Sequence, residues 1–425
     1  MKKIAVLGCG TVGSGVVEVF YKNRQSIQRK AGCPLDIKYI YLRRPRPELP
    51  WQDKLCYDFD TILHDPEISI VVEVMGGLHP AGEWIAACLK NNKSVVTANK
   101  ELIAAQGAQL LALARQHQVN LLFEASVGGG IPIIRPLHQC LGANELDDIQ
   151  GILNGTTNFI LTKMSREGMC FSQALQMAQQ LGYAEADPTA DVQGLDACRK
   201  ICILASLAFG RQLYPQLVHC QGITELTPED VEYARNWGGV IKLIARAHRD
   251  PDTQQLSALV APMFVPHDSQ LSTVDDVFNG ILVDGDATGQ VLFYGKGAGK
   301  LPTASAVVAD VIDALKEGVH VHDSLFWKPA PKLEGQLKDE AVYPWYIRVS
   351  GVSAALLPNV AGAGHTVFEA DGQAAYLIDA ATAAQIEEAL RVGGESTVVV
   401  GIGTIATHLR DLAKSYKEAQ IALEV

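Results

Sequence analysis

The feature that most constrains the fold of this chain lies at its N-terminus, where a short apolar run leads into three spaced glycines and then a helical pattern. Residues 4–7 predict a buried strand, and residues 8–13 read Gly-Cys-Gly-Thr-Val-Gly. Gly8 permits a tight turn, Gly10 leaves room for a pyrophosphate, and Gly13 lets helix and strand approach closely. The free N–H groups and positive dipole end of the helix favour phosphate binding. The pattern predicts a dinucleotide site, with a ligand-free glycine turn as the alternative.

Strand-like and helical patterns alternate over residues 1–135. Apolar strand patterns recur at residues 37–42, 70–74, 94–97 and 120–123, and helical patterns such as 84–89 and 108–117 separate them. Such alternation is typical of a parallel sheet that is covered by helices on both faces. We therefore expect residues 1–135 to form a Rossmann-type, doubly wound dinucleotide-binding domain.

The rest of the chain predicts a second large unit, since 425 residues suffice for two or three domains. Residues 136–325 mix longer helices with antiparallel strands and indicate an α+β domain. Within it, Thr227 opens a helix that is expected to run towards Ala247, because a Pro and acids follow this capping residue. Residues 280–294 predict a hairpin, and a helix near 302–317 is expected to pack back on the first domain.

The C-terminal part predicts a third, smaller unit. Residues 326–344 contain prolines and charges and indicate a linker. Residues 345–425 begin with an alternating strand, continue with a helix and two strands around Asp371-Gly372, and finish with a helix and a strand. This βαββαβ order resembles the ACT fold, a module that commonly senses amino acids.

Composition and charge exclude several classes of function. Acidic residues number 47 against 36 basic residues, and this net charge of −11 disfavours a main role in binding nucleic acid or anionic membranes. The nine cysteines are scattered and form no CxxC pair, so free thiols are expected rather than disulfides or zinc ligands. The first apolar run stops at Leu7, too short for a signal peptide, and no stretch approaches 18 apolar residues. We therefore expect a cytoplasmic protein.

The end of the second predicted strand indicates which dinucleotide is bound. An acid there would accept the 2′-hydroxyl of NAD, but the strand is followed by Arg43, Arg44 and Arg46 and by no acid. Guanidinium groups bind a 2′-phosphate bidentately, so we expect NADP, with NAD possible. A solvated basic loop is the alternative, since surface arginines are common.

The most informative stretch runs from residue 181 to residue 200 and places four acids before an apolar helix. Asp196 and Lys200 lie four residues apart and so share one helix face. At the edge of a pocket, this set suits a small zwitterion, because the acids can hold its ammonium and Lys200 can serve an oxygen that gains or loses a proton. A surface helix with one ion pair and an acidic cap explains the same spacing.

Three further polar segments follow predicted strands. Lys100 ends the segment Thr-Ala-Asn-Lys after the fourth strand, and the carboxyl ends of such strands face the ligand crevice. Residues 154–158 read Asn-Gly-Thr-Thr-Asn, which either orients a polar substrate or caps a helix. Glu124 precedes a glycine-rich loop whose carbonyls suit a hard monovalent cation or simply form the crossover between domains.

Together these segments resemble the homoserine dehydrogenase family. The motifs GxGxxG, TANK, EASVGGGIP, NGTTN, GYAEADP and GLDACRK occur in the order found in that family, and the resemblance covers the chain to about residue 318. The stretch GYAEADPTADVQGLDACRK is much more specific than the glycine fingerprint. The resemblance implies reversible, NAD(P)H-dependent reduction of L-aspartate 4-semialdehyde to L-homoserine, on the route to threonine and methionine.

The resemblance also implies roles for the residues at matching positions. Lys200 would donate a proton to the aldehyde oxygen, and Lys100 would lie near that oxygen. Glu185 and Asp196 would hold the substrate ammonium, with Asp191 supporting the site. The implied cofactor contacts are Gly8, Gly10, Thr11, Val12, Gly13, Arg43, Arg44, Thr97, Lys100, Gly182 and Gly299. The implied ligands of a structural, sodium-like cation are Glu124 and the backbone carbonyls of Val127, Gly129 and Ile131.

For assembly and regulation, the resemblance implies a homodimer or higher oligomer built through the sheet of residues 136–325, which would bind substrate and dimerise. Threonine as an effector rests only on the βαββαβ order of the C-terminal unit. The loop after its first strand departs from the usual Asp-x-Pro-Gly of ACT modules and reads Gly-Val-Ser-Ala-Ala at 351–355. A role in assembly is the alternative.

Two other functions compete with this reading. Another small-substrate reductase would use the same first domain, although an aspartate-semialdehyde dehydrogenase needs a nucleophilic cysteine, and Cys9 would face the cofactor phosphates. An NADP-binding sensor would report cofactor state through the C-terminal unit. Such a sensor has no need of the set formed by Glu185, Asp196 and Lys200.

Overall fold

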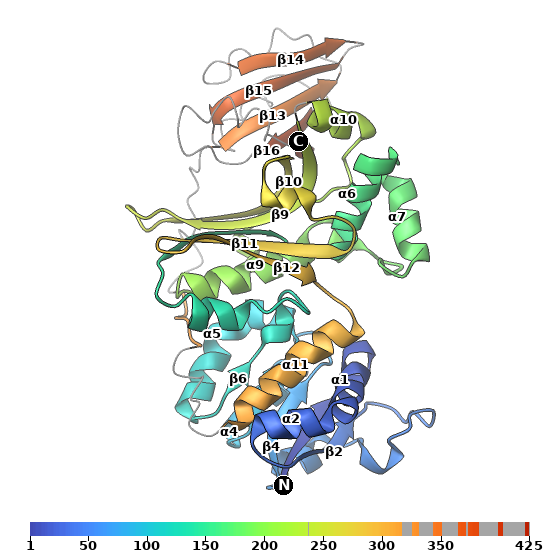
Figure 1. Ribbon diagram of the computed structural model, residues 1–425, viewed down its shortest axis with the longest axis vertical. Coiled ribbons are helices and arrows are strands. Elements are labelled where there is room, and N and C mark those ends of the chain that lie inside the picture. Colours follow the sequence, from blue (N-terminus) through green and yellow to red (C-terminus); the bar gives the residue numbers. More distant parts are fainter. Residues whose placement is uncertain are drawn as a thin grey trace.

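Three sheets follow one another along the long axis of the molecule in the computed structural model (Figure 1). The structure describes residues 1–236, 238–316 and 325–330, and five C-terminal strands at 343–350, 364–370, 373–381, 398–402 and 421–424. Among the described residues, no helix is long and apolar enough to cross a membrane.

The first sheet has six parallel strands in the order β3-β2-β1-β4-β5-β6. Its strands are β1 (Lys2–Leu7), β2 (Leu35–Tyr41), β3 (Leu55–Cys56), β4 (Ile68–Glu73), β5 (Ser94–Thr97) and β6 (Leu121–Leu122). The sequence predicts all of these strands except β3, whose two residues are too few for any periodicity. The Rossmann-type sheet is therefore confirmed. Its central strands are buried on both faces, as parallel strands covered by helices must be.

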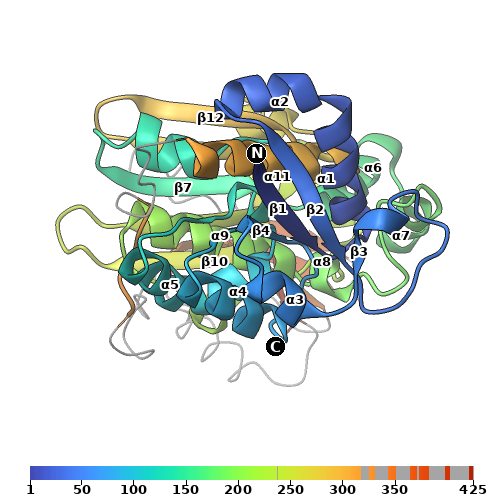
Figure 2. The same cartoon turned by 90° about the horizontal axis from the view of Figure 1, so that it is seen from below.

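Helices cover both faces of this sheet (Figure 2). One face carries α1 (Thr11–Lys22), α2 (Arg24–Ala31) and α11 (Lys300–Leu315), and the other carries α3 (Phe59–His64), α4 (Ala81–Lys90) and α5 (Lys100–Gln116). The late helix α11 lies directly against α1, because a Cβ added to Gly15 would stand 2.7 Å from the Lys300 carbonyl oxygen. The chain thus returns to the first sheet after it has built the second.

The second sheet is mixed, in the order β12-β11-β7-β9-β10-β8. Its strands are β7 (Leu146–Ile152), β8 (His219–Cys220), β9 (Gly239–Arg249), β10 (Leu256–Pro266), β11 (Phe278–Gly285) and β12 (Gly289–Lys296). The helices of this region are α6 (Gly155–Glu167), α7 (Phe171–Gln180), α8 (Thr189–Val192), α9 (Leu195–Ala208) and α10 (Pro228–Asn236). Short helical turns complete the chain: η1 (Gln52–Lys54), η2 (Glu124–Ser126), η3 (Pro136–Cys140), η4 (Pro215–Leu217) and η5 (Gln270–Thr273).

The helix that opens at Thr227 is shorter than predicted. It ends at Asn236, and the residues expected to continue it towards Ala247 form β9 instead. Gly238 and Gly239 interrupt the helix, and the β-branched residues that follow pair with β10 over eleven positions. The hairpin expected over 280–294 is present as β11 and β12.

The C-terminal strands form a third, antiparallel sheet in the order β14-β15-β13-β16-β17. They are β13 (Tyr343–Ser350), β14 (Gly364–Ala370), β15 (Gln373–Ala381), β16 (Val398–Ile402) and β17 (Ile421–Glu424). The first four lie where the βαββαβ order places strands, and β17 is additional. The helices expected over 354–361 and 383–391, and the loop 351–355, lie outside the described residues.

The start of the expected linker is packed against the fold. Trp327 is fully buried, and its indole nitrogen donates to the side-chain oxygen of Gln212 at 2.8 Å. The same oxygen accepts the backbone N–H of Ala108 in α5 at 2.9 Å. A Cβ on Gly107 would meet the Trp327 ring at 2.4 Å, so α5, this segment and the loop after α9 are held together. Only the later part of 326–344 remains assigned to a linker.

Candidate active site

The glycine turn between β1 and α1 has the geometry of a phosphate site. Gly10 precedes α1 without a side-chain cap, and a Cβ there would meet no atom of the chain within 4 Å. At Gly13, by contrast, a Cβ would stand 2.1 Å from the carbonyl oxygen of Gly8, whose φ is +103°. Thr11 and Val12 begin the helix, so their amides lack intrahelical partners. Five of the predicted cofactor residues therefore lie in one turn, in which Gly10 and Thr11 are exposed and Gly13 is buried.

One of the arginines after β2 reaches this turn. Arg43 and Arg44 are exposed, and their guanidiniums form no hydrogen bond or ion pair with the described residues. Arg46 reaches the turn itself, where its Nη1 donates to the Cys9 carbonyl at 3.2 Å and its Nε pairs with Glu48 at 2.6 Å. Arg46 was predicted to lie in the basic loop but was not among the predicted cofactor residues, because spacing alone does not show which guanidinium folds back onto the turn.

The second cluster forms where α9 begins. Asp196 and Lys200 are both buried, and their carboxylate and ammonium groups lie 2.6 Å apart. The Lys200 ammonium also donates to the Leu153 carbonyl at 2.7 Å. Asn154 donates to both Asp191 at 2.7 Å and Asp196 at 2.9 Å, so one amide aligns two carboxylates. Asp196 and Lys200, predicted to share one face of a helix, are therefore a buried ion pair. Asn154 is also a site residue, whereas the sequence indicated only that one or more of the polar groups at 154–158 orient a substrate.

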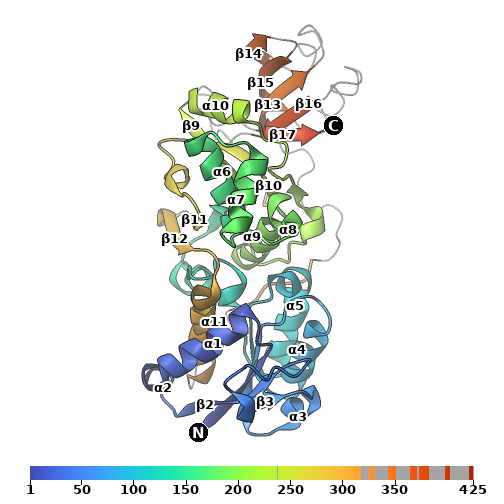
Figure 3. The same cartoon turned by 90° about the vertical axis from the view of Figure 1, so that its right-hand side faces the viewer.

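Lys100 approaches the same carboxylate from α5, a helix that covers the first sheet (Figure 2). It is the first residue of α5, and the Asn99 side chain caps that helix by accepting the Leu102 N–H at 3.1 Å. Its ammonium pairs with Asp196. Next to it, Arg199 of α9 pairs with Glu101 of α5 at 3.1 Å. Two neighbouring ion pairs thus join α5 and α9. Figure 3 shows these two helices where the first and second sheets meet.

Burial and mutual charge perturb the titration of this cluster. Burial lowers the pKa of Lys200, the ammonium of Lys100 lowers it further, and Asp196 opposes both effects. Burial alone would raise the pKa of Asp196, but Lys200 and Lys100 together hold it well below its usual range. Burial raises the pKa of Asp191. An ammonium whose pKa is lowered in a cleft can exchange a proton near neutral pH.

A cavity of about 650 Å³ opens onto this cluster. Its walls bring together residues that the sequence assigns to substrate or cofactor, namely Lys100, Gly182, Glu185, Asp191, Asp196, Lys200 and Gly299. The carboxylate of Glu185 is exposed and faces this space. The volume is of the size that small-molecule sites have, and several charged side chains are among the residues that line it.

Thr97 differs from the other predicted cofactor residues. Its side chain is fully buried, and its hydroxyl donates to Glu73 at 2.6 Å. Glu73 also accepts the backbone N–H groups of Met75 at 2.7 Å and Gly76 at 3.1 Å. These two side chains therefore hold the loop after β4. Glu73 was not among the predicted site residues, although an acid at the end of a strand is a signal that the sequence carries.

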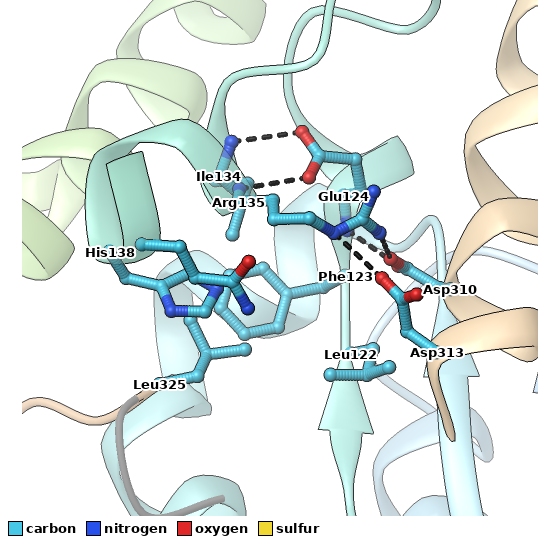
Figure 4. Close-up of a pocket in the computed structure, with 10 residues that line it drawn as sticks. Leu122, Phe123, Glu124, Ile134, Arg135, His138, Asp310, Asp313 and Leu325 are labelled. Atoms are coloured by element: carbon cyan, nitrogen blue, oxygen red, sulfur yellow. Dashed lines mark hydrogen bonds and ion pairs between the residues drawn. The ribbon is translucent and has the colours of Figure 1, made fainter. Parts of the chain in front are cut away.

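The predicted cation ligands lie in the loop after β6. The Glu124 carboxylate accepts three backbone N–H groups, from Ile133 at 2.6 Å and from Ile134 and Arg135 at 2.9 Å. Figure 4 shows the bonds from Ile134 and Arg135. A carboxylate offers about four acceptor positions, so about one remains. The carbonyls of Val127, Gly129 and Ile131 accept no backbone hydrogen bond from the described residues outside helices and strands. Oxygen donors of this kind fit a hard cation.

An ionic network adjoins this loop and ties it to α11 (Figure 4). Arg135 pairs with Asp310 at 2.9 Å and with Asp313 at 2.8 Å, and Asp310 accepts the Glu124 backbone N–H at 2.9 Å. Burial, and then the charge of Glu124, raise the pKa of Asp310 to about 8. Burial, and then Arg135, lower the pKa of His138 to about 4. The network fixes the loop to the helix that returns to the first sheet.

Two family models match the part of the chain that builds these sites. The model described as "Homoserine dehydrogenase, NAD binding domain" matches residues 8–124, and the model described as "Homoserine dehydrogenase" matches residues 132–312. A third, described as "GGDEF-like domain", matches residues 338–425. That match covers the unit for which an ACT-like fold is expected, and the ACT-like assignment stays a prediction.

Individual relatives agree with the first two models. The homoserine dehydrogenase of Synechocystis sp. is 49% identical over 317 residues, covering 73% of this chain and 72% of its own. The crystal structure of a homoserine dehydrogenase from Thiobacillus denitrificans superposes with a TM-score of 0.83 at 34% identity, covering 93% of this chain and 97% of its own. A hyperthermophilic archaeal homoserine dehydrogenase in complex with NADPH superposes with a TM-score of 0.62 at 26% identity, covering 74% and 98%.

Proposed function

The chain belongs to the homoserine dehydrogenase family, and from this premise we propose that its catalytic step takes place in the cavity beside Lys200. It is an NAD(P)-dependent oxidoreductase that acts on a CH–OH group, and it interconverts L-aspartate 4-semialdehyde and L-homoserine in amino-acid biosynthesis. The observation that carries the assignment of the step is the shared carboxylate of Asp196. It holds two lysines, one from α5 and one from α9, in a cavity that is also lined by Gly299.

The two lysines have different roles at the substrate oxygen. The chemistry that the nicotinamide supplies when bound is hydride transfer to or from the carbonyl carbon. Negative charge develops on the aldehyde oxygen during reduction, and Lys200 donates a proton to it while Lys100 stabilises the charge. Asp196 keeps both ammonium groups in place. Asn154 fixes the orientation of Asp196, since its amide nitrogen donates to that carboxylate.

The acids of the cavity receive the substrate ammonium. Glu185 is exposed on the wall and is available for this contact, whereas Asp196 is already paired with both lysines. Asp191 lies between Glu185 and Asp196 in the sequence, and its carboxylate accepts a hydrogen bond from the Asn154 amide. We therefore assign the main ammonium contact to Glu185 and a supporting one to Asp191, with Asp196 serving substrate and lysines together.

NADP is the proposed cofactor, because arginines follow β2 and residues 42–46 contain no acid. The test compares initial rates of homoserine oxidation with NADP and with NAD, in the wild type and in Arg43→Ala/Arg44→Ala. The variant should raise the KM for NADP about tenfold, which corresponds to roughly 1.4 kcal/mol, and leave that for NAD nearly unchanged. Equal changes for both cofactors would contradict the assignment. Absence of homoserine-dependent reduction of either cofactor would contradict the function itself.

A sodium-like cation is proposed in the loop after β6, supported by the three carbonyls of Val127, Gly129 and Ile131. It would hold the loop in shape beside Glu124. The activity and thermal stability should therefore be higher in NaCl than in tetramethylammonium chloride at equal ionic strength. Identical values in the two salts would contradict it.

A homodimer through the second sheet is also proposed, as the family resemblance implies. It is supported by the edge strand β12, on which Tyr294 is 53% exposed and stacks on Phe278 with ring centres 5.3 Å apart. Light scattering coupled to size exclusion should give twice the mass of the chain, and Tyr294→Lys should shift it towards the monomer. A monomeric mass for the wild type would contradict it.

For the C-terminal unit, we keep threonine as the proposed effector, supported only by the order of its first four strands. Inhibition of the forward rate by threonine tests it, and no effect at saturation would contradict it.

A cytoplasmic location is supported by the nine cysteines, all of which are free thiols.

A further inference from the structure

The segment of residues 274–277, which joins η5 to β11, is held in place by side chains from two other elements. It forms neither helix nor strand, so its backbone groups depend on partners elsewhere in the fold. Those partners are Asn158 and Thr162 of α6 and Lys242 of β9, and all three side chains are buried. Their contacts decide where this segment lies.

Lys242 holds the start of the segment. Only 2% of this residue is exposed, so its ammonium costs free energy unless its donors are bonded. An ammonium has three donors, and three acceptors surround this one. They are the carbonyl of Val274 at 2.6 Å, the carboxylate of Asp275 at 3.1 Å and the side-chain oxygen of Asn158 at 3.2 Å. Two of these acceptors belong to the segment, which is thereby tied to β9.

Asn158 holds the same segment from α6. Its amide nitrogen donates to the carbonyls of Val274 and Asp276 at 3.0 Å and of Phe278 at 3.1 Å. One helical turn further on, the Thr162 hydroxyl accepts the backbone N–H of Asp276 at 3.0 Å. The segment is therefore bonded to α6 from its first residue to the start of β11.

The last residue of the segment, Val277, lines the cavity of the candidate active site. A Cβ on Gly155 would stand 2.9 Å from the Val277 carbonyl oxygen, so the segment packs on the first residue of α6. The residue before it, Asn154, donates to both Asp191 and Asp196. Val277 is thus placed beside the residues that align the acids of the cavity.

We propose that Lys242 and Asn158 are positioning residues that hold Val277 in the cavity wall, where it fixes the fit of the substrate chain. Neither residue lines the cavity, so each acts through the segment that it bonds. Asn154 and Asn158 lie one turn apart on α6, so a single helix sets both the acids and this wall. The inference rests on the proposed function, because it concerns the substrate of that same site.

A positioning role has a kinetic signature that a purely structural role lacks. Loss of a wall that contacts the bound substrate weakens substrate binding, whereas the lysines that serve the reacting oxygen stay where they are. A change that removes such uniform binding raises KM and leaves kcat nearly constant. The KM for homoserine should therefore respond, and the KM for NADP should not.

The test measures initial rates of homoserine oxidation by the full chain in two variants. Val277→Ala removes the wall and leaves its supports intact. Lys242→Met removes the support but keeps a long apolar side chain, and it leaves Asp275 paired with Arg166. Each variant should raise the KM for homoserine about tenfold, while kcat stays within about threefold and the KM for NADP within about twofold.

Lys93→Met is the matched control. Lys93 is also buried, with 5% exposed, and its ammonium donates to the carbonyls of Asp65 at 2.6 Å and Ile68 at 2.9 Å. It precedes β5 at the end of that strand opposite Thr97 and lies outside the cavity lining. This variant should lower the melting temperature, as Lys242→Met does, and should leave kcat and both KM values within about twofold of the wild type.

Two results would overturn the proposal. One is an unchanged KM for homoserine in Val277→Ala or in a folded Lys242→Met. The other is a rise in that KM in Lys93→Met as large as in Lys242→Met. If Lys242→Met does not fold, Thr162→Val decides the question, since it removes the acceptor of the Asp276 N–H. That variant should raise the KM for homoserine, and an unchanged KM would contradict the proposal. Absence of homoserine oxidation by the wild type would instead count against the proposed function.

Discussion

Replacing Asp196 with Asn tests whether one carboxylate keeps two lysines charged at the centre of the site. The change preserves shape but removes the negative charge that Lys200 meets at 2.6 Å. Lys200 is buried, with 9% of its side chain exposed, so its ammonium would lose most of its compensation. Lys100 is 39% exposed and loses little, because solvent screens its pair. We therefore expect the cost to fall on Lys200.

The size of this cost can be bounded. Breaking a buried ion pair by removal of one partner costs about 3–5 kcal/mol. The folded variant can also escape by deprotonating Lys200, which at pH 7 costs about 4.6 kcal/mol for a lysine of ordinary pKa, since each pKa unit is about 1.36 kcal/mol. We expect Asp196→Asn to lower the free energy of unfolding by about 3–4.5 kcal/mol at pH 7.

The pH dependence gives the sign of the effect. With Asp196 gone, the pKa of Lys200 falls further below its ordinary value, so the folded variant carries Lys200 neutral while the unfolded chain still binds that proton. Stability then rises with pH, by up to about 1.4 kcal/mol per unit between pH 7 and the unfolded pKa. The deficit of the variant should shrink to about 2 kcal/mol at pH 9.

Urea unfolding followed by circular dichroism at pH 7 and pH 9 measures both quantities. Glu185→Gln is the matched control, because its exposed carboxylate should change stability by no more than about 0.5 kcal/mol at either pH. A deficit for Asp196→Asn below about 1 kcal/mol, or one that is equal at both pH values, would refute the buried pair described above.

The cofactor turn and the junction of the two sheets give three further predictions. Gly10→Ala should leave stability unchanged and weaken NADP binding at least about tenfold, measured by titration with NADP. Gly13→Ala should instead lower the free energy of unfolding by about 1–3 kcal/mol, measured by urea unfolding. Arg46→Ala should raise the KM for NADP about tenfold and leave that for NAD unchanged. Arg199→Leu and Glu101→Gln should each lower kcat/KM about tenfold, and the double variant should lose no more than either alone. Additive losses would contradict that last coupling.

The first sheet was predictable because its signals are local. Parallel strands buried on both faces are nearly continuous apolar runs, and the glycines between residues 8 and 13 are tied to the turn that requires them. The prediction of the helix from Thr227 was wrong beyond Asn236, because the pairing of β9 with β10 outweighs the local helical pattern. Two-residue strands such as β3 carry no period and could not be found.

The site was predictable only as far as spacing on one element reaches. Asp196 and Lys200 share a helix face, which four residues of separation already imply. Their burial, the contact of Asp196 with Lys100 of α5 and the two hydrogen bonds of Asn154 depend on tertiary packing. The contact of Arg46 with the glycine turn also depends on tertiary packing. The basic loop contains three arginines, and the sequence does not show which of them reaches the turn.

The central claim is that Lys200 moves the proton of the reaction. Lys200→Ala is compared with the wild type in two measurements, the initial rate of homoserine oxidation followed by nicotinamide absorbance and the binding of NADPH followed by fluorescence. The account predicts that kcat falls by about 10²- to 10⁴-fold while the Kd for NADPH stays within about twofold. Normal turnover in Lys200→Ala would contradict it.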